Sequence, residues 1–129
     1  MQLMGFQSRQ YLLNAAARHH IFLSPSVVAE DGDCEGGAPL AIAEMAAVGM
    51  IVVSTKHCDI PSMIQMQEGG FLANERDPQG LATHLRWLVA NPDRWASIRQ
   101  AARQRIESFF NAEVQGRTLS DIYIELAQR

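Results

Sequence analysis

The chain has 129 residues, of which 47% are hydrophobic and 19% charged, and its formal net charge is −3 at pH 7. This length predicts a single domain over residues 1–129, and the composition is typical of an ordinary globular protein. The acidic balance gives no general case for nucleic acid as a partner, and no apolar run approaches the roughly 18 residues of a membrane helix.

The first 20 residues predict a strand end followed by a helix. Met1 to Gly5 resembles the tail of a strand, and Ser8 is a candidate N-cap for the helix that follows. A bare strand edge invites pairing with another chain. We therefore expect self-association through the exposed sheet edge at residues 1–5.

Two short apolar runs predict buried parallel strands. Ile21 to Ser24 and Met50 to Ser54 both lack the polar alternation of a half-exposed strand. A helix between them gives a strand–helix–strand unit, which favours parallel pairing and a right-handed crossover. Ligands of such sheets bind beyond the carboxyl ends of the strands, where the polar loops after Ser24 and Ser54 are expected to lie.

The first of these loops carries the clearest candidate site. Glu35 precedes Gly36–Pro39, and Glu44 lies on the helix expected to open at Pro39. Free N–H groups at a helix start favour anions such as phosphate, and the two glycines leave the backbone accessible. We expect the two carboxylates to bind sugar hydroxyls, as an acidic residue does on a ribose, or to flank a reacting sugar. An ordinary helix entry with two unrelated glutamates is the alternative.

The second loop begins with Lys56 and His57, which are candidates to meet phosphate charge; a solvated loop is the alternative. The acidic run at residues 29–35 lacks the regular ligand spacing of a calcium loop. A transition-metal cluster can also be imagined from Cys34, His57, Cys58 and Asp59. Neither the spacing nor a paired Cys-x-x-Cys supports it, so no metal is expected.

The second half of the chain predicts one more strand and several helices. Ile60-Pro61 starts a short helical turn, and Gly69-Gly70 turns into a short last strand over Phe71 to Ala73. Asp77-Pro78 and Asn91-Pro92 each combine an N-cap with proline at the first helical position. A last helix over about residues 112–128 is expected to pack Leu119, Ile122, Tyr123 and Leu126.

The segment EGGAPLAIAEMAAVGMIVVSTKHCDIP resembles the signature of retaining glycosyltransferases with two Rossmann-like domains, a family that includes colanic-acid-type bacterial polysaccharide transferases. The resemblance continues through Gly69–Leu72, Asp77 and the closing helices, so it covers nearly the whole chain. It implies an α/β fold: a Rossmann-like parallel sheet of about three to four strands flanked by helices, with a C-terminal helical pair.

The resemblance also implies roles for individual residues. Glu35 corresponds to the acid beside the donor sugar and diphosphate, and Glu44 to the ribose ligand. The backbone cradle for the donor corresponds to Gly36, Gly37, Ala38, Pro39 and Leu40. Two features depart from the family: the interval from Glu35 to Glu44 is one residue longer than its commonest form, and Ser62 stands where a glutamate is frequent.

The function that the resemblance implies is transfer of a hexose from a UDP- or GDP-sugar to a glycan or lipid-linked acceptor, with no metal or other cofactor. The acceptor would be held by an N-terminal domain that this chain lacks. The family's basic pair lies upstream of the first glutamate, whereas Arg9 and Arg18 lie on the first predicted helix. We therefore expect an incomplete donor site and a chain that is inactive alone.

Two functions of other classes are alternatives to a glycosyltransferase. A non-catalytic module that docks another chain is the main alternative. A small esterase or phosphatase is disfavoured, because the sequence has no Gly-x-Ser-x-Gly motif. The N-terminus lacks a signal-peptide pattern, and the two cysteines form no disulfide framework. The expected location is the cytoplasm, with peripheral contact to the inner membrane.

Overall fold

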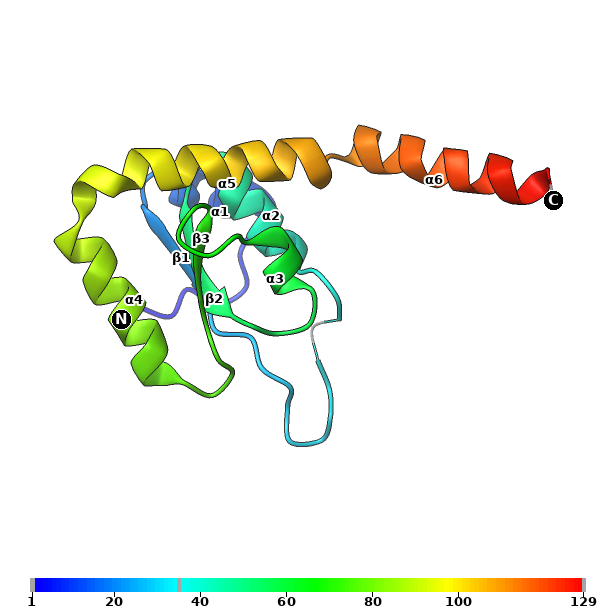
Figure 1. The fold of residues 1–129 in the computed structure, drawn as a ribbon. Helices are drawn as coiled ribbons and strands as arrows, with labels where there is room; N and C mark the ends of the chain where they lie inside the picture. The colour runs from blue at the N-terminus through cyan, green and yellow to red at the C-terminus, as the bar shows by residue number, and fades with distance from the viewer. Residues whose placement is uncertain (1, 35, 129) are drawn as a thin grey trace.

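The computed structural model describes residues 2–34 and 36–128. Its centre is a three-stranded parallel sheet in the order β1-β2-β3, with helices on both faces (Figure 1). The register pairs Phe22 with Val52 and Val53 with Phe71. The predicted α/β class with a parallel sheet is confirmed. The strands are β1 (Ile21–Ser24), β2 (Ile51–Thr55) and β3 (Gly70–Ala73).

The helices begin largely where the sequence predicts. Ser8 accepts a hydrogen bond from the backbone N–H of Tyr11 at 3.2 Å, and Asp77 accepts one from Gly80 at 2.8 Å, so both predicted N-caps are confirmed. The helices are α1 (Arg9–Ala16), α2 (Leu40–Val48), α3 (Ile60–Met63), α4 (Pro78–Ala90), a 3-10 turn η1 (Pro92–Arg94), α5 (Trp95–Phe109) and α6 (Ala112–Ala127).

The core has a layer on each face of the sheet. The alternation of side chains along a strand sends Val52 to one face and Ile51 and Val53 to the other. On the first face α2, α3 and the later turns of α5 contribute Ile42, Ala46, Ile60, Met63, Ala102 and Ile106. On the second face α4 and the start of α5 contribute Leu81, Leu85, Leu88, Trp95 and Ile98.

The N-terminal segment does not form the predicted strand. The described residues 2–5 are irregular, Gly5 has a φ of 62°, and Leu3 is 86% exposed. A strand needs a neighbour for its backbone hydrogen bonds, and the sheet ends at β1 on one side. Among the described residues the edge strands of the sheet are β1 and β3, and the prediction of an edge at residues 1–5 is wrong.

The last helix does not pack its apolar face as predicted. α6 begins after Asn111, whose side chain caps it, and projects away from the sheet and the other helices (Figure 1). The four side chains that were expected to be buried are between 48% and 64% exposed. Helical periodicity shows which side chains share a face, but it does not supply the surface that covers them. No helix within the described residues is long and apolar enough to cross a bilayer.

Candidate functional site

Three loops meet at the carboxyl edge of the sheet. They follow β1 (residues 25–39), β2 (residues 56–59) and β3 (residues 74–77). Since all three strands are parallel, these loops leave the sheet at the same end. This is the edge at which parallel α/β sheets place their ligands.

Two short contacts fasten the loop after β1 to the end of β2. Ser54 donates its hydroxyl to the carbonyl of Ser24 at 2.6 Å, and the hydroxyl of buried Thr55 donates to the carbonyl of Ser26. Polar side chains in a fully buried strand need such partners. The hydroxyls at the end of β2 therefore set the direction in which the first loop leaves the sheet.

A line of interacting side chains crosses all three loops. The Nδ1 atom of His57 lies 2.7 Å from Oε1 of Glu75, and its Nε2 atom lies 3.3 Å from Sγ of Cys58. Cys34 is near enough to Cys58 to raise the pKa of its thiol. The imidazole is fully buried, whereas both cysteines are exposed. The line therefore runs from a carboxylate in the third loop to a thiol in the first.

Glu75 also holds the first loop through its second carboxylate oxygen. The backbone N–H of Val28 donates to Oε2 at 3.1 Å, and Arg76 donates to the carbonyl of Val28 at 2.7 Å. The hydrogen bond from His57, followed by the one from Val28, lowers the pKa of Glu75. Glu75 is therefore held as a carboxylate that accepts from two loops at once.

Partial desolvation by the surrounding loops raises the pKa of the Cys58 thiol although the residue is exposed, and the neighbouring Cys34 acts in the same direction. Cys58 also has a φ of 44°, a left-handed conformation that is uncommon for residues with a side chain. Strained backbone of this kind persists only where surrounding contacts fix it. The contact to His57 is one such contact.

The glycine-rich segment before α2 is docked onto the start of α3. The carbonyl of Gly37 accepts from the backbone N–H of Asp59 at 3.1 Å, and a Cβ at Gly37 would lie 2.9 Å from the Asp59 carboxylate. Gly36 has a φ of 79°, which glycine adopts without cost. The close approach of Asp59 therefore favours glycine at position 37, and the left-handed backbone favours glycine at position 36.

Pro39 is the N-cap of α2, with extended backbone, and α2 begins at Leu40. The helix thus opens one residue later than predicted. A proline side chain cannot accept a hydrogen bond, and α2 has no side-chain cap and no acidic residue in its first turn. The N–H groups of that turn are the kind of donors that anions bind at helix starts. Leu40 is 79% exposed, so the surface here is open.

Of the two glutamates predicted to bind the donor, only Glu44 lies within the described residues. Glu35 lies outside the described residues. Glu44 lies on α2, and its carboxylate accepts from Arg9 of α1 at 3.0 Å. The side chain of Glu44 is 41% exposed and that of Arg9 is 74% exposed, so this ion pair contributes little to stability. Glu44 and Arg9 can therefore exchange their mutual contact for a ligand at little cost.

His57 and Lys56, the two residues predicted to meet phosphate charge, differ in burial. Lys56 is exposed, and its backbone N–H pairs with the end of β3 through the carbonyl of Ala73. His57 is buried, with protein partners on both ring nitrogens. A role for His57 as a direct ligand of phosphate stays a prediction. Of the two side chains, Lys56 is the one that is open to solvent.

Sequence reasoning missed Glu75 and the role of Arg9. Glu75 stands two residues after the last strand, so its place at the carboxyl edge of the sheet was the available signal. Nothing in the sequence indicated that Arg9 pairs with Glu44, because the two lie 35 residues apart. Among the described residues, no three His, Cys, Asp or Glu side chains are grouped so as to hold a metal ion.

Ser62 replaces a glutamate that the predicted family often carries, and here it has a structural role. Its hydroxyl donates to the carbonyl of Asp59 at 2.7 Å, and its own carbonyl accepts two hydrogen bonds from Arg105. α3 is thereby tied to α5. The substitution removes a charge from this loop and leaves the short helix in place.

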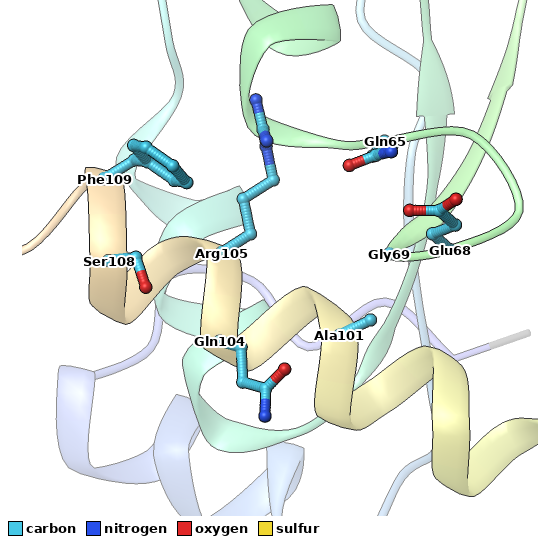
Figure 2. A pocket seen from close by; sticks show the side chains of 8 residues that line it. All are labelled: Gln65, Glu68, Gly69, Ala101, Gln104, Arg105, Ser108 and Phe109. Atoms are coloured by element: carbon cyan, nitrogen blue, oxygen red, sulfur yellow. The ribbon is translucent and has the colours of Figure 1, made fainter.

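A polar hollow of about 260 Å³ lies between α5 and the loop that precedes β3 (Figure 2). The guanidinium of Arg105 stands over the Phe109 ring, 5.4 Å from its centroid. Gly69 in the floor precedes β3, so the hollow lies at the amino end of that strand. It is therefore remote from the three loops. Its lining residues are Gln65, Glu68, Gly69, Ala101, Gln104, Arg105, Ser108 and Phe109.

Residues 1–105 match the family model described as glycosyl transferases group 1. The chain is 38% identical over 127 residues to the amylovoran biosynthesis glycosyltransferase AmsK of Erwinia amylovora, covering 98% of this chain and 31% of AmsK. It is 39% identical over 123 residues to the "Putative colanic acid biosynthesis glycosyltransferase WcaL" of Escherichia coli K12, covering 95% of this chain and 30% of WcaL.

Among solved structures, the chain is similar to a sucrose-phosphate synthase from Thermosynechococcus elongatus. The TM-score is 0.82 at 20% identity, and the match covers 98% of this chain and 30% of the other. At this identity the likeness shows the fold, which is Rossmann-like. The chain thus spans about 30% of the length of each of these three proteins.

Proposed function

Because this chain belongs to the glycosyl transferases group 1 family, we propose that it is the donor-binding part of a retaining glycosyltransferase. The intact enzyme would transfer a hexose from a UDP- or GDP-sugar to a glycan or lipid-linked acceptor. The names of the amylovoran and colanic acid relatives support a polysaccharide product. We propose that the reaction takes place in the cytoplasm, with peripheral contact to the inner membrane.

The open N-terminus of α2 at the carboxyl edge of the sheet is the observation that carries this proposal. Its first turn has no side-chain cap and no acidic residue, and Gly36 and Gly37 precede it. N–H groups and the helix dipole together favour a diphosphate there. Lys56, exposed at the end of β2, would add positive charge.

The proposed roles follow the polarity of the donor. Glu44 would accept hydrogen bonds from the ribose hydroxyls, after exchanging or sharing its contact with Arg9. Glu35 would lie beside the sugar and the diphosphate. His57 would act by holding the second loop against Glu75. No metal and no other cofactor enter this scheme.

The chemistry requires charge to build up on the departing diphosphate. Hydrogen-bond donors that are already oriented toward it stabilise that charge as it develops. The chain supplies such donors at the start of α2. The acceptor site and any further basic groups would come from an N-terminal domain, for which the longer relatives have room. The chain alone would bind the donor weakly and not transfer sugar.

The experiment is a calorimetric titration of the chain with UDP, GDP, UDP-glucose and GDP-mannose, with inorganic phosphate as the control. We expect one nucleotide series to bind at millimolar concentration or better, and more tightly than phosphate. Lys56→Ala should weaken that binding. Equal, weak binding of all ligands, phosphate included, would contradict a donor site.

A second candidate function, docking of another chain, is favoured by a separate surface. β1 has a free edge, and an apolar hollow of about 200 Å³ lies beside it between α1 and α2. An edge of this kind pairs readily with a further strand. A second copy would give a dimer by light scattering after gel filtration; a monomer at high concentration would exclude it. The hollow is lined by Leu12, Ala15, Ala16, His19, Ile21, Phe22, Met45 and Met50.

A further inference from the structure

The two cysteines of the chain come together although they lie 24 residues apart in sequence. Cys34 is in the loop after β1, and Cys58 follows β2. The backbone N–H of Asp59, next to Cys58, donates to the carbonyl of Gly37 at 3.1 Å and so joins the two loops. Cys34 is near enough to raise the pKa of the Cys58 thiol, and both cysteines are exposed. Two accessible thiols on loops that are held together are placed to form a disulfide.

The neighbours of Cys58 fix where its proton can go. A carboxylate only accepts hydrogen bonds, so the contact between Glu75 and Nδ1 of His57 places the ring proton on Nδ1. Nε2 of the neutral ring is then an acceptor, 3.3 Å from Sγ of Cys58. A base oriented by a third group beside a nucleophile is the arrangement that activates thiols.

The contact with His57 also provides a way to deprotonate Cys58 although the pKa of its thiol is raised. A thiol that stays protonated at neutral pH is a poor nucleophile unless a neighbouring base takes its proton. His57 is within reach to do so, and Glu75 would stabilise the imidazolium that results. Cys34 has no comparable base among the contacts of the described residues.

We propose that Cys34 and Cys58 are a redox-active pair that closes to a disulfide in exchange with glutathione disulfide. Cys58 gives its proton to Nε2 of His57, and its thiolate attacks one sulfur of glutathione disulfide. One glutathione leaves, and a mixed disulfide remains on Cys58. Cys34 then attacks the Cys58 sulfur and releases the second glutathione. Two electrons pass from the protein to glutathione, and the two protons end on the two released thiols.

The bond would join the first loop to the second at the carboxyl edge of the sheet. Cys34 directly precedes Glu35, and the second loop already holds Gly37 through Asp59. Closure would fix the glycine-rich segment in one position. The proposal itself concerns the two thiols and does not depend on the proposed donor site.

The test is incubation of the full chain with defined ratios of oxidised to reduced glutathione, followed by acid quenching, thiol alkylation and intact mass analysis. We expect a species that has lost two hydrogens and carries no alkyl group. Its fraction should rise with the oxidised share. Cys34→Ser should stop at a mixed disulfide on Cys58. Two alkylated thiols at every ratio, or glutathione on both cysteines without closure, would overturn the proposal.

Two controls distinguish a disulfide that the fold promotes from one that forms by random encounter of the two thiols. In urea, where the contacts are lost, closure should fall by at least about tenfold at the same glutathione ratio. The Cys34→Ser variant keeps Cys58, and the Cys58→Ser variant keeps Cys34. Cys58 in the first variant should react with glutathione disulfide on the order of tenfold faster than Cys34 in the second. Equal closure in urea, or equal rates for the two variants, would contradict the roles of the fold and of His57.

Discussion

The fully buried imidazole of His57 lies with Nδ1 2.7 Å from Oε1 of Glu75. This contact joins the loop after β2 to the loop after β3. The second carboxylate oxygen of Glu75 holds the loop after β1 through Val28. A single side chain thus braces the whole carboxyl edge of the sheet.

Glu75→Gln should lower stability in a pH-dependent way. The pKa of Glu75 lies below its ordinary value of 4.5 in the folded chain, so its contribution is complete above about pH 4.5 and is lost as the pH falls through the lowered pKa. The melting temperature of the variant should therefore trail the parent at pH 7, and the gap should close in acid. Glu113→Gln, in the exposed pair with Arg117, is the control and should change little. A gap that stays constant down to pH 2 would refute the assignment.

Gly70→Ala should destabilise the sheet. A Cβ at Gly70 would lie 2.6 Å from the carbonyl oxygen of Val52 and 2.8 Å from a methyl of Ile64, so the backbone of β2 or β3 must move. We expect a loss of roughly 3 kcal/mol or more in urea unfolding. Gly116→Ala, where the new methyl meets nothing within 4 Å, is the matched control and should be neutral or stabilising by up to about 1 kcal/mol. Equal stabilities for the two variants would show that β3 is packed differently.

Glu44→Ala should weaken nucleotide binding without unfolding the chain. Loss of a charged acceptor for ribose hydroxyls predicts roughly tenfold lower affinity. The side chain is half exposed, so the melting temperature should barely change. Glu107→Ala, which breaks the exposed pair with Arg103 on α5, should leave affinity unchanged. An unaltered affinity in Glu44→Ala would remove the ribose assignment.

Removal of α6 should leave the fold intact. The helix buries no residue, and its apolar side chains are largely exposed. A chain ending at Phe110 should keep the far-UV circular dichroism of the remaining helices and sheet. Its melting temperature should stay within a few degrees of the parent. Its solubility should rise, because exposed apolar area is removed. A collapse of the cooperative transition would show that α6 covers part of the core.

The sequence predicted what depends on local patterns. β1 matches its predicted bounds, β2 is shifted by one residue, and the caps at Ser8 and Asp77 are as expected. These features follow from apolar runs and from side chains that bond their own neighbours. The same reasoning placed the glycine-rich loop at the carboxyl edge of the sheet.

What the sequence could not predict depends on partners distant in the chain. A fully buried His57 was not expected, because its hydrogen-bond partner Glu75 lies 18 residues further on. The exposure of Leu119 on α6 and the irregular N-terminal residues were missed for a related reason. A pattern shows that a segment can pack or pair, and the tertiary structure decides whether a partner is there.

A nucleotide-sugar site at the start of α2 can be located by amide NMR of the labelled chain during titration with UDP, GDP and their sugar conjugates. We expect shifts that cluster on residues 36–44 and 56–59, and the ligands that bind more tightly should shift these amides at lower concentration. Shifts confined to the hollow around Arg105, or none at millimolar ligand, would contradict it.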